Sequence, residues 1–112
     1  MPDEPLPKPP PAPDPLRGQP VPAGSLLDEM FGGRVVIDLR SSYVALGTLV
    51  GADELFLLLK NADLHDLRDT DTTRENYIAE SKATGIKRNR KRVLVLRSDM
   101  VAIARLDDVV DE

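Results

Sequence analysis

The residues with the clearest chemical potential form a short cationic run late in the chain. Positions 87–92 read Lys-Arg-Asn-Arg-Lys-Arg, so five of six residues are cations in a chain of net charge −4. Concentrated positive charge attracts phosphate groups and speeds association with anionic partners. Two other interpretations stay open: a solvated flank that pairs with the acids of residues 63–71 or of a neighbouring subunit, and a nuclear-localisation signal. The residues predicted to bind phosphate are Lys87, Arg88, Arg90, Lys91 and Arg92.

Residues that could support catalysis or metal binding are sparse. His65-Asp66 is the one acidic cluster with a histidine, and a metal site needs more ligands in a fixed geometry. The lack of cysteine excludes disulfides, thiolate zinc sites and a cysteine nucleophile. Gly32-Gly33 has neither the spacing nor the lysine of a phosphate-binding loop. We therefore predict a protein that is not an enzyme, without a metal or cofactor, in a reducing, cytoplasmic compartment, with His65 on the surface or in a hairpin.

Three apolar runs between Arg34 and Ala62 are the elements that must position the cationic run. In the first run, Val35, Ile37 and Leu39 alternate with the other residues at the period of a strand. Gly47 lies in the middle of the second run, where glycine marks a sharp bend or a close backbone approach. A short sheet that bends hard at its second strand tends to curl into a small barrel. The pattern therefore predicts an all-β domain.

The same residues resemble a known family. The first motif of the Sm and Sm-like proteins is similar to Ile37-x-Leu39, Gly47-x-Leu49, Asp53 and the apolar run that ends near Ala62. Their second motif resembles residues 93–101, and the whole resemblance covers about residues 26–108. It implies a strongly bent five-stranded antiparallel barrel behind an N-terminal helix. It also implies assembly into rings and binding of single-stranded RNA.

The resemblance carries over to the site residues only in part. In RNA-binding members, an Asn of the first motif and an Arg-Gly pair of the second line the pore and hold a base. The Arg maps onto Arg97, but Ser98 replaces the Gly, and the Asn position falls on Phe56 or Leu55. Phe56 is either a core residue or a platform on which a base could stack. Because the usual pocket is incomplete, RNA binding by the cationic run is better supported than binding in a family-type pocket.

The first 24 residues differ in composition from the rest of the chain. All ten prolines fall between Pro2 and Pro22, so residues 1–24 are expected to form a disordered, extended tail rather than a helix or a strand. Residues 25–112 form a single domain. Residues 25–32 predict a short helix with Ser25 as its N-cap and Gly32 as its stop. No apolar run approaches the length of a membrane span, so we expect no membrane partner.

Residues 63–92 are least like the family and are expected to form a long inserted loop, first acidic and then basic. A capping box from Thr72 to Glu75 and a terminal Gly85 predict a helix over about residues 73–84. Its apolar residues Tyr77 and Ile78 would face the barrel. An extra strand over residues 76–81 is the alternative.

The last two strands, residues 93–96 and 100–106, are both apolar and would be the two edges of an open barrel. Exposed apolar edges are closed by pairing, and head-to-tail pairing of copies generates a ring. The expected function is therefore a homo-oligomeric ring that binds single-stranded RNA. The alternative is the same ring used as a protein scaffold without RNA, docking partners through the proline tail or the acidic rim.

Overall fold

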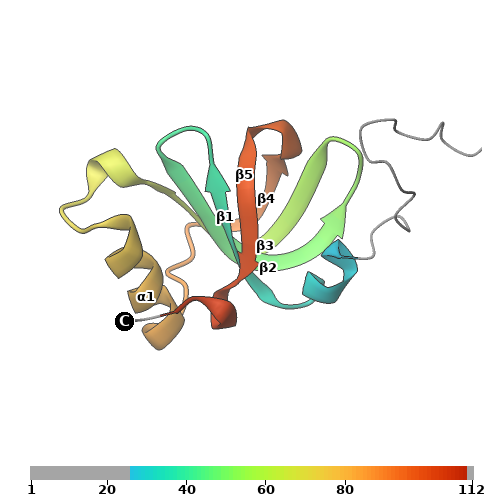
Figure 1. Cartoon of the computed structure of the whole chain (residues 1–112). Coiled ribbons are helices and arrows are strands. Elements are labelled where there is room, and N and C mark those ends of the chain that lie inside the picture. The colour runs from blue at the N-terminus through green and yellow to red at the C-terminus, as the bar shows by residue number, and fades with distance from the viewer. Residues whose placement is uncertain (1–25, 111–112) are drawn as a thin grey trace, which may run out of the picture.

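The computed structural model describes residues 26–110, which form a five-stranded sheet and the helix α1. Figure 1 shows the sheet curled into a small barrel with α1 beside it. The predicted tail over residues 1–24 and the predicted cap Ser25 lie outside the described residues. The elements are β1 (Arg34–Leu39), β2 (Tyr43–Ala52), β3 (Phe56–Asp66), α1 (Arg74–Thr84), β4 (Arg90–Leu96) and β5 (Met100–Arg105). Four short 3-10 turns accompany them: η1 (Leu27–Met30) before β1, η2 (Leu67–Asp69) before α1, η3 (Arg97–Asp99) before β5 and η4 (Leu106–Asp108) after β5. The strand order is β4-β3-β2-β1-β5 and every pair is antiparallel, which confirms the predicted fold class.

Gly47 sets the bend of the sheet. A Cβ atom added there would lie 3.0 Å from the Cβ of Ala62 and 3.2 Å from the Cβ of Leu59. The register of β2 against β3 also shifts beside it, between Leu46 and Thr48. Because only a residue without a side chain allows β3 to come this close, β2 can fold over β3 and close the barrel. The expected close approach at Gly47 is therefore confirmed.

The sheet is apolar on both faces, and each face has its own core. The interior core fills the barrel, with Leu27, Met30 and other half-buried residues packed around it. The outer core lies between the outer face of the sheet and α1. The buried residues of the interior core are Val35, Ile37, Ala45, Leu49, Leu57, Leu59, Ala62 and Val95. Those of the outer core are Val36, Val44, Leu46, Tyr77, Ile78 and Leu106.

Helix α1 confirms the predicted helical insertion, and the alternative of an extra strand is wrong. Its N-cap is Thr73 rather than Thr72, because the Thr73 hydroxyl accepts a hydrogen bond from the N–H of Asn76 at 3.1 Å. Gly85 ends the helix at φ +100°, a conformation that glycine adopts without strain. The residues Tyr77 and Ile78 face the barrel as expected, but from outside.

Three polar contacts hold α1 against the sheet and the C-terminal end of the domain. Arg74 at its first turn forms an ion pair with Asp38 at the end of β1. In its middle, the Tyr77 hydroxyl donates a hydrogen bond to the carboxylate of Asp63. Near its end, the Lys82 ammonium group donates to the carbonyl of Val109 at 2.6 Å. The helix is therefore fixed along its whole length.

Two predicted boundaries differ from the structure. The N-terminal helix is, within the described residues, the single turn η1, and Leu26 before it is 75% exposed. Strand β3 continues through residues 63–66, which were expected in the loop, because they pair with the start of β2, Tyr43 opposite Asp66. Residues 90–92 likewise belong to β4, so the insertion spans 67–89.

Strands β4 and β5 are the two ends of the sheet order, so each has one edge without a neighbouring strand. A hollow of about 460 Å³ opens along β4 and the β1–β2 turn, where Val93, Val95 and Leu39 reach its wall. Among residues 26–110 no helix is long and apolar enough to cross a membrane.

Candidate nucleic-acid interface

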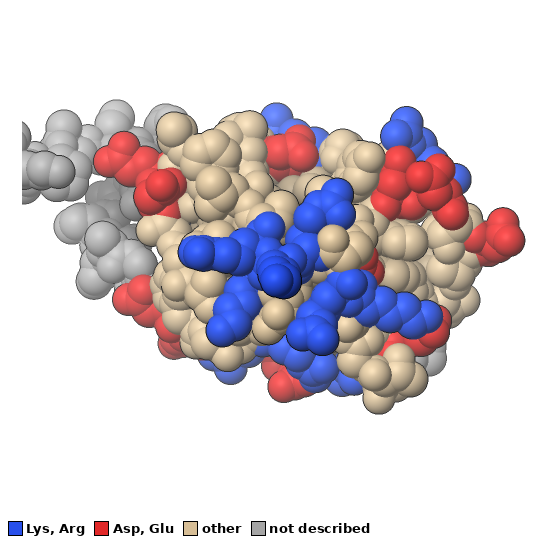
Figure 2. Space-filling model, turned by 180° about the vertical axis from the view of Figure 1, so that it is seen from behind, with Lys and Arg blue, Asp and Glu red and all other residues tan. Residues whose placement is uncertain are grey.

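The basic segment, residues 87–92, lies where the chain returns from α1 to the sheet. Asn89 fixes this return, because its side chain accepts a hydrogen bond from the N–H of Leu64 and donates one to the Leu64 carbonyl, both at 3.0 Å. All five cations of the segment are exposed. Figure 2, turned to the face that lies at the back of Figure 1, shows Lys and Arg side chains gathered at its centre. The structure thus places the segment on an open surface.

Lys60 extends this surface from the neighbouring strand, and sequence reasoning missed it. Lys60 on β3 is exposed and lies directly opposite Arg92 on β4. Like charges directly opposite in an antiparallel pair are unfavourable. The alternation of β3 places Lys60 on the outer face, but only the β3–β4 register shows that it meets Arg92.

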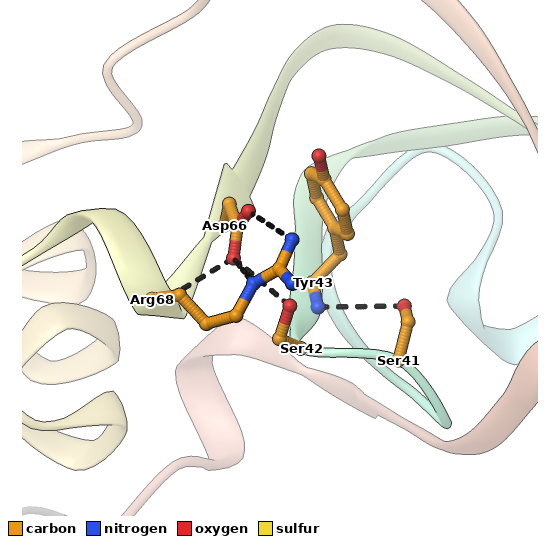
Figure 3. Close-up of polar contacts among 5 residues, drawn as sticks. All are labelled: Ser41, Ser42, Tyr43, Asp66 and Arg68. Atoms are coloured by element: carbon orange, nitrogen blue, oxygen red, sulfur yellow. Dashed lines mark hydrogen bonds and ion pairs between the residues drawn. The ribbon is translucent and has the colours of Figure 1, made fainter.

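The nearby acids do not neutralise the basic segment. Asp63 is buried beneath α1, and burial raises the pKa of its carboxyl group. Asp66 accepts hydrogen bonds from Arg68 and from the hydroxyl of Ser42 (Figure 3). The bonds from Arg68 have the larger effect, and together these bonds hold the pKa of Asp66 well below its usual range. Among residues 26–110, the segment forms one ion pair, Lys87 with Glu80 at 3.4 Å. The expected pairing with the acids of residues 63–71 is absent there.

Arg97 and Phe56 lie together at the far end of the sheet. The guanidinium of Arg97, in η3, donates to the carbonyl of Asp53 at 2.6 Å. The Asp53 carboxylate accepts hydrogen bonds from the N–H groups of Phe56 at 2.7 Å and Leu55 at 2.9 Å, which lower the pKa of Asp53. Asp53 therefore holds the β2–β3 turn. Phe56 is half-buried opposite Leu96 and belongs to neither core, so the core interpretation of Phe56 is wrong.

The structure separates the predicted site residues into two groups. The basic segment precedes and begins β4, whereas Arg97 follows its last residue, Leu96. Six residue steps along a strand span about 20 Å. Lys87, Arg88, Arg90, Lys91 and Arg92 therefore lie toward one end of β4, and Arg97 and Phe56 lie at the other.

His65 lies in β3, paired with Val44 of β2 in the β2–β3 hairpin, so the hairpin position is confirmed; the ring is half-buried beneath α1. Its ring stacks on Tyr77 with 4.1 Å between the ring centroids and 14° between the planes. The His65 Nε2 atom is buried and has no hydrogen-bond partner among the described residues. Nowhere in residues 26–110 do three or more His, Cys, Asp or Glu side chains form a group that could hold a metal. The contacts of His65 are therefore those of a residue that holds the helix to the sheet.

No protein-family model matches the chain, and no curated protein matches it by sequence. Solved structures do match. An Sm protein from Pyrococcus abyssii in complex with a uridine heptamer aligns with a TM-score of 0.51 over 74% of this chain and 96% of its own, at 14% identity. The P. aerophilum SmAP1 heptamer aligns with a TM-score of 0.52 over 76% and 93%, at 22% identity. An Sm-like protein from Archaeoglobus fulgidus aligns with a TM-score of 0.51 over 79% and 99%, at 17% identity. These likenesses establish the fold.

Proposed function

Taking the Sm fold of this chain as the premise, we propose that copies of it assemble into a ring that binds single-stranded RNA through the basic segment. The role is one of binding, without catalysis. Two similar proteins support the proposal, one in complex with a uridine heptamer and the other a heptamer.

The sheet edges support assembly. Strand β4 exposes one free edge and β5 exposes the other, and the apolar side chain of Val101 on β5 is exposed. Because the two edges differ, pairing β4 of one copy with β5 of the next is a head-to-tail contact, which closes into a ring when the rotation allows. The hollow of about 460 Å³ along β4 lies at the seam that such pairing would cover.

The observation that carries RNA binding is the unneutralised charge of the basic surface. Arg88, Arg90, Lys91 and Arg92, together with Lys60, are exposed and form no ion pair with a described carboxylate. Elsewhere, Arg34 pairs with Asp107, Arg68 with Asp66 and Arg105 with Glu29. Cations left without partners in a chain of net charge −4 are suited to an anionic ligand.

The test compares two double variants that remove the same charge. Arg88→Gln with Arg90→Gln should weaken binding of a labelled single-stranded RNA and reduce its salt dependence, since each lost phosphate contact lowers the slope of log affinity against log salt by about 0.7. The control, Arg34→Gln with Arg105→Gln, removes two cations that already have carboxylate partners and should leave both quantities nearly unchanged. Fluorescence anisotropy over a salt series measures both. Equal losses in the two variants, or no binding by the unmodified protein, would contradict the proposal.

Assembly is tested separately by sedimentation of the unmodified protein. A mass that is a multiple of the monomer at micromolar concentration is expected, and a stable monomer would contradict the ring. A ring that binds no RNA but copurifies with a protein would favour the scaffold alternative.

A further inference from the structure

The outer face of β3 and β4 combines positive charge with exposed apolar side chains. Val93 and Val95 of β4 point into the interior core, so Leu94 between them points outward. Lys91 is on the side of Val93, whereas Arg92 is on the outer side. The outer face consists of Phe56, Leu58 and Lys60 on β3, with Arg92, Leu94 and Leu96 on β4. One end of this face is therefore basic and the other end apolar.

The basic end contains a repulsive pair. Lys60 and Arg92 are opposite each other in register, and neither has a carboxylate partner among the described residues. Arg90 is opposite Ala62 of the interior core, so it lies on the other side of β4 from this pair. A phosphate that contacts both Lys60 and Arg92 would relieve their repulsion.

A hollow lies where the basic end meets the apolar end. Its volume is about 250 Å³ and its walls are Leu58, Arg92, Val93 and Leu94. Leu94 is 58% exposed and Leu96 44%. Pockets for small-molecule ligands usually begin at roughly 300 Å³, so this hollow suits a single ring rather than a whole cofactor. An apolar wall beside a guanidinium fits one nucleobase and its phosphate.

We propose that single-stranded RNA lies along β4 on this outer face, with a phosphate on Lys60 and Arg92 and one base between Leu58 and Leu94. This inference rests on the proposed function and specifies its binding path. The path connects the basic segment to Phe56 and Arg97 at the other end of β4, so both groups of site residues lie on one track. The base contact is apolar and contains no group that reads base edges, so binding tolerates different sequences.

The first test uses two neighbouring cations on opposite sides of β4. Arg92→Gln should reduce the affinity for a mixed-sequence 12-nucleotide RNA about tenfold and lower the salt slope by about 0.7, whereas Lys91→Gln, on the other side of β4, should reduce the affinity and the salt slope by less. Fluorescence anisotropy with the full chain measures both. Equal losses in the two variants would overturn the track while leaving RNA binding by the basic segment intact. No binding by the unmodified protein would remove the proposed function itself.

The second test isolates the base contact. Leu94→Ser should reduce affinity about fivefold, because it removes apolar contact, but should leave the salt slope unchanged, because it removes no phosphate contact. The effect should vanish on an abasic RNA of the same length. Leu94→Ala serves as a second variant, and an unchanged urea midpoint confirms that either variant is folded.

Two outcomes of the second test would overturn the track. One is the same loss on normal and abasic RNA. The other is that a poly-glutamate peptide displaces RNA and that Leu94→Ser weakens binding of this peptide as much as it weakens binding of RNA. That result would identify an acidic protein segment as the occupant.

Discussion

The outer face of the sheet has two halves, one buried beneath α1 and one exposed. Over β1 and the first part of β2, Val36, Val44 and Leu46 are buried beneath α1. On β4, which pairs with the first part of β3, Leu94 and Leu96 are exposed near cations. We call these the covered half and the open half. Both halves contain apolar side chains, so hydrophobicity does not distinguish them; what distinguishes them is the presence of a packed element.

The comparison separates folding from binding. In the covered half, packing and three polar contacts from Arg74, Tyr77 and Lys82 hold α1 in place. In the open half, the side chains have few partners within the subunit, so they contribute little to its stability and are free to contact a ligand. Variants in the covered half should therefore change stability, and variants in the open half should change binding.

The largest expected effect is at Ile78 in the covered half. Ile78→Ala should lower the free energy of unfolding by about 2–4 kcal/mol, because the buried side chain leaves a cavity. Leu94→Ala in the open half is the matched control and should change it by less than about 0.5 kcal/mol. Urea titrations at one protein concentration measure both, since assembly makes stability depend on concentration. Similar losses at the two positions would break the distinction between the halves.

A smaller effect is expected at the bend that divides the halves. Gly47→Ala should lower the free energy of unfolding by about 1–3 kcal/mol, because the new Cβ atom meets the Cβ atoms of Ala62 and Leu59. The control is Gly51→Ala, whose Cβ atom would lie at an ordinary contact distance of 3.4 Å from the Cβ of Leu58. Thermal unfolding compares the two variants. A tolerated Gly47→Ala would mean that close approach to β3 does not set the bend.

The smallest effect distinguishes two acids on β3 by the sign of their pH dependence. Asp63, in the covered half, has a pKa raised above 3.8 by burial, so the native state holds its proton longer than the unfolded state. Its contribution to stability is present below pH 3.8 and is lost as pH rises through the higher folded pKa. Asp66 has a lowered pKa, so its contribution is present above pH 3.8 and is lost as pH falls below that value.

The measurement is the free energy of unfolding against pH for the unmodified protein and two variants. Asp63→Asn should remove part of the loss on raising the pH, and its amide oxygen can still accept the hydrogen bond of Tyr77. Asp66→Asn should instead remove part of the loss in acid. Identical profiles for the two variants would show that burial beneath α1 does not distinguish these carboxyl groups.

Local preferences made much of the fold predictable. The alternation around Ile37, the glycine at position 47 and the signals at both ends of α1 each depend on neighbours close in sequence. The cap was misplaced by one residue, because Thr72 and Thr73 have the same chemistry and only the backbone decides between them. Residues 63–66 were expected in a loop because they are mainly polar, yet strand pairing with β2 holds them in β3.

The sequence by itself determined that the chain would curl a five-stranded sheet and concentrate its cations in one segment, because hydrophobic period and charge are properties of neighbouring residues. Only the tertiary structure decided which half of the outer face α1 covers, that Lys60 meets Arg92, and that Arg97 lies at the other end of β4 from the basic segment. Those outcomes depend on strand register and on the direction in which a long insertion packs. Both are contacts between residues far apart in the chain, which no local pattern specifies.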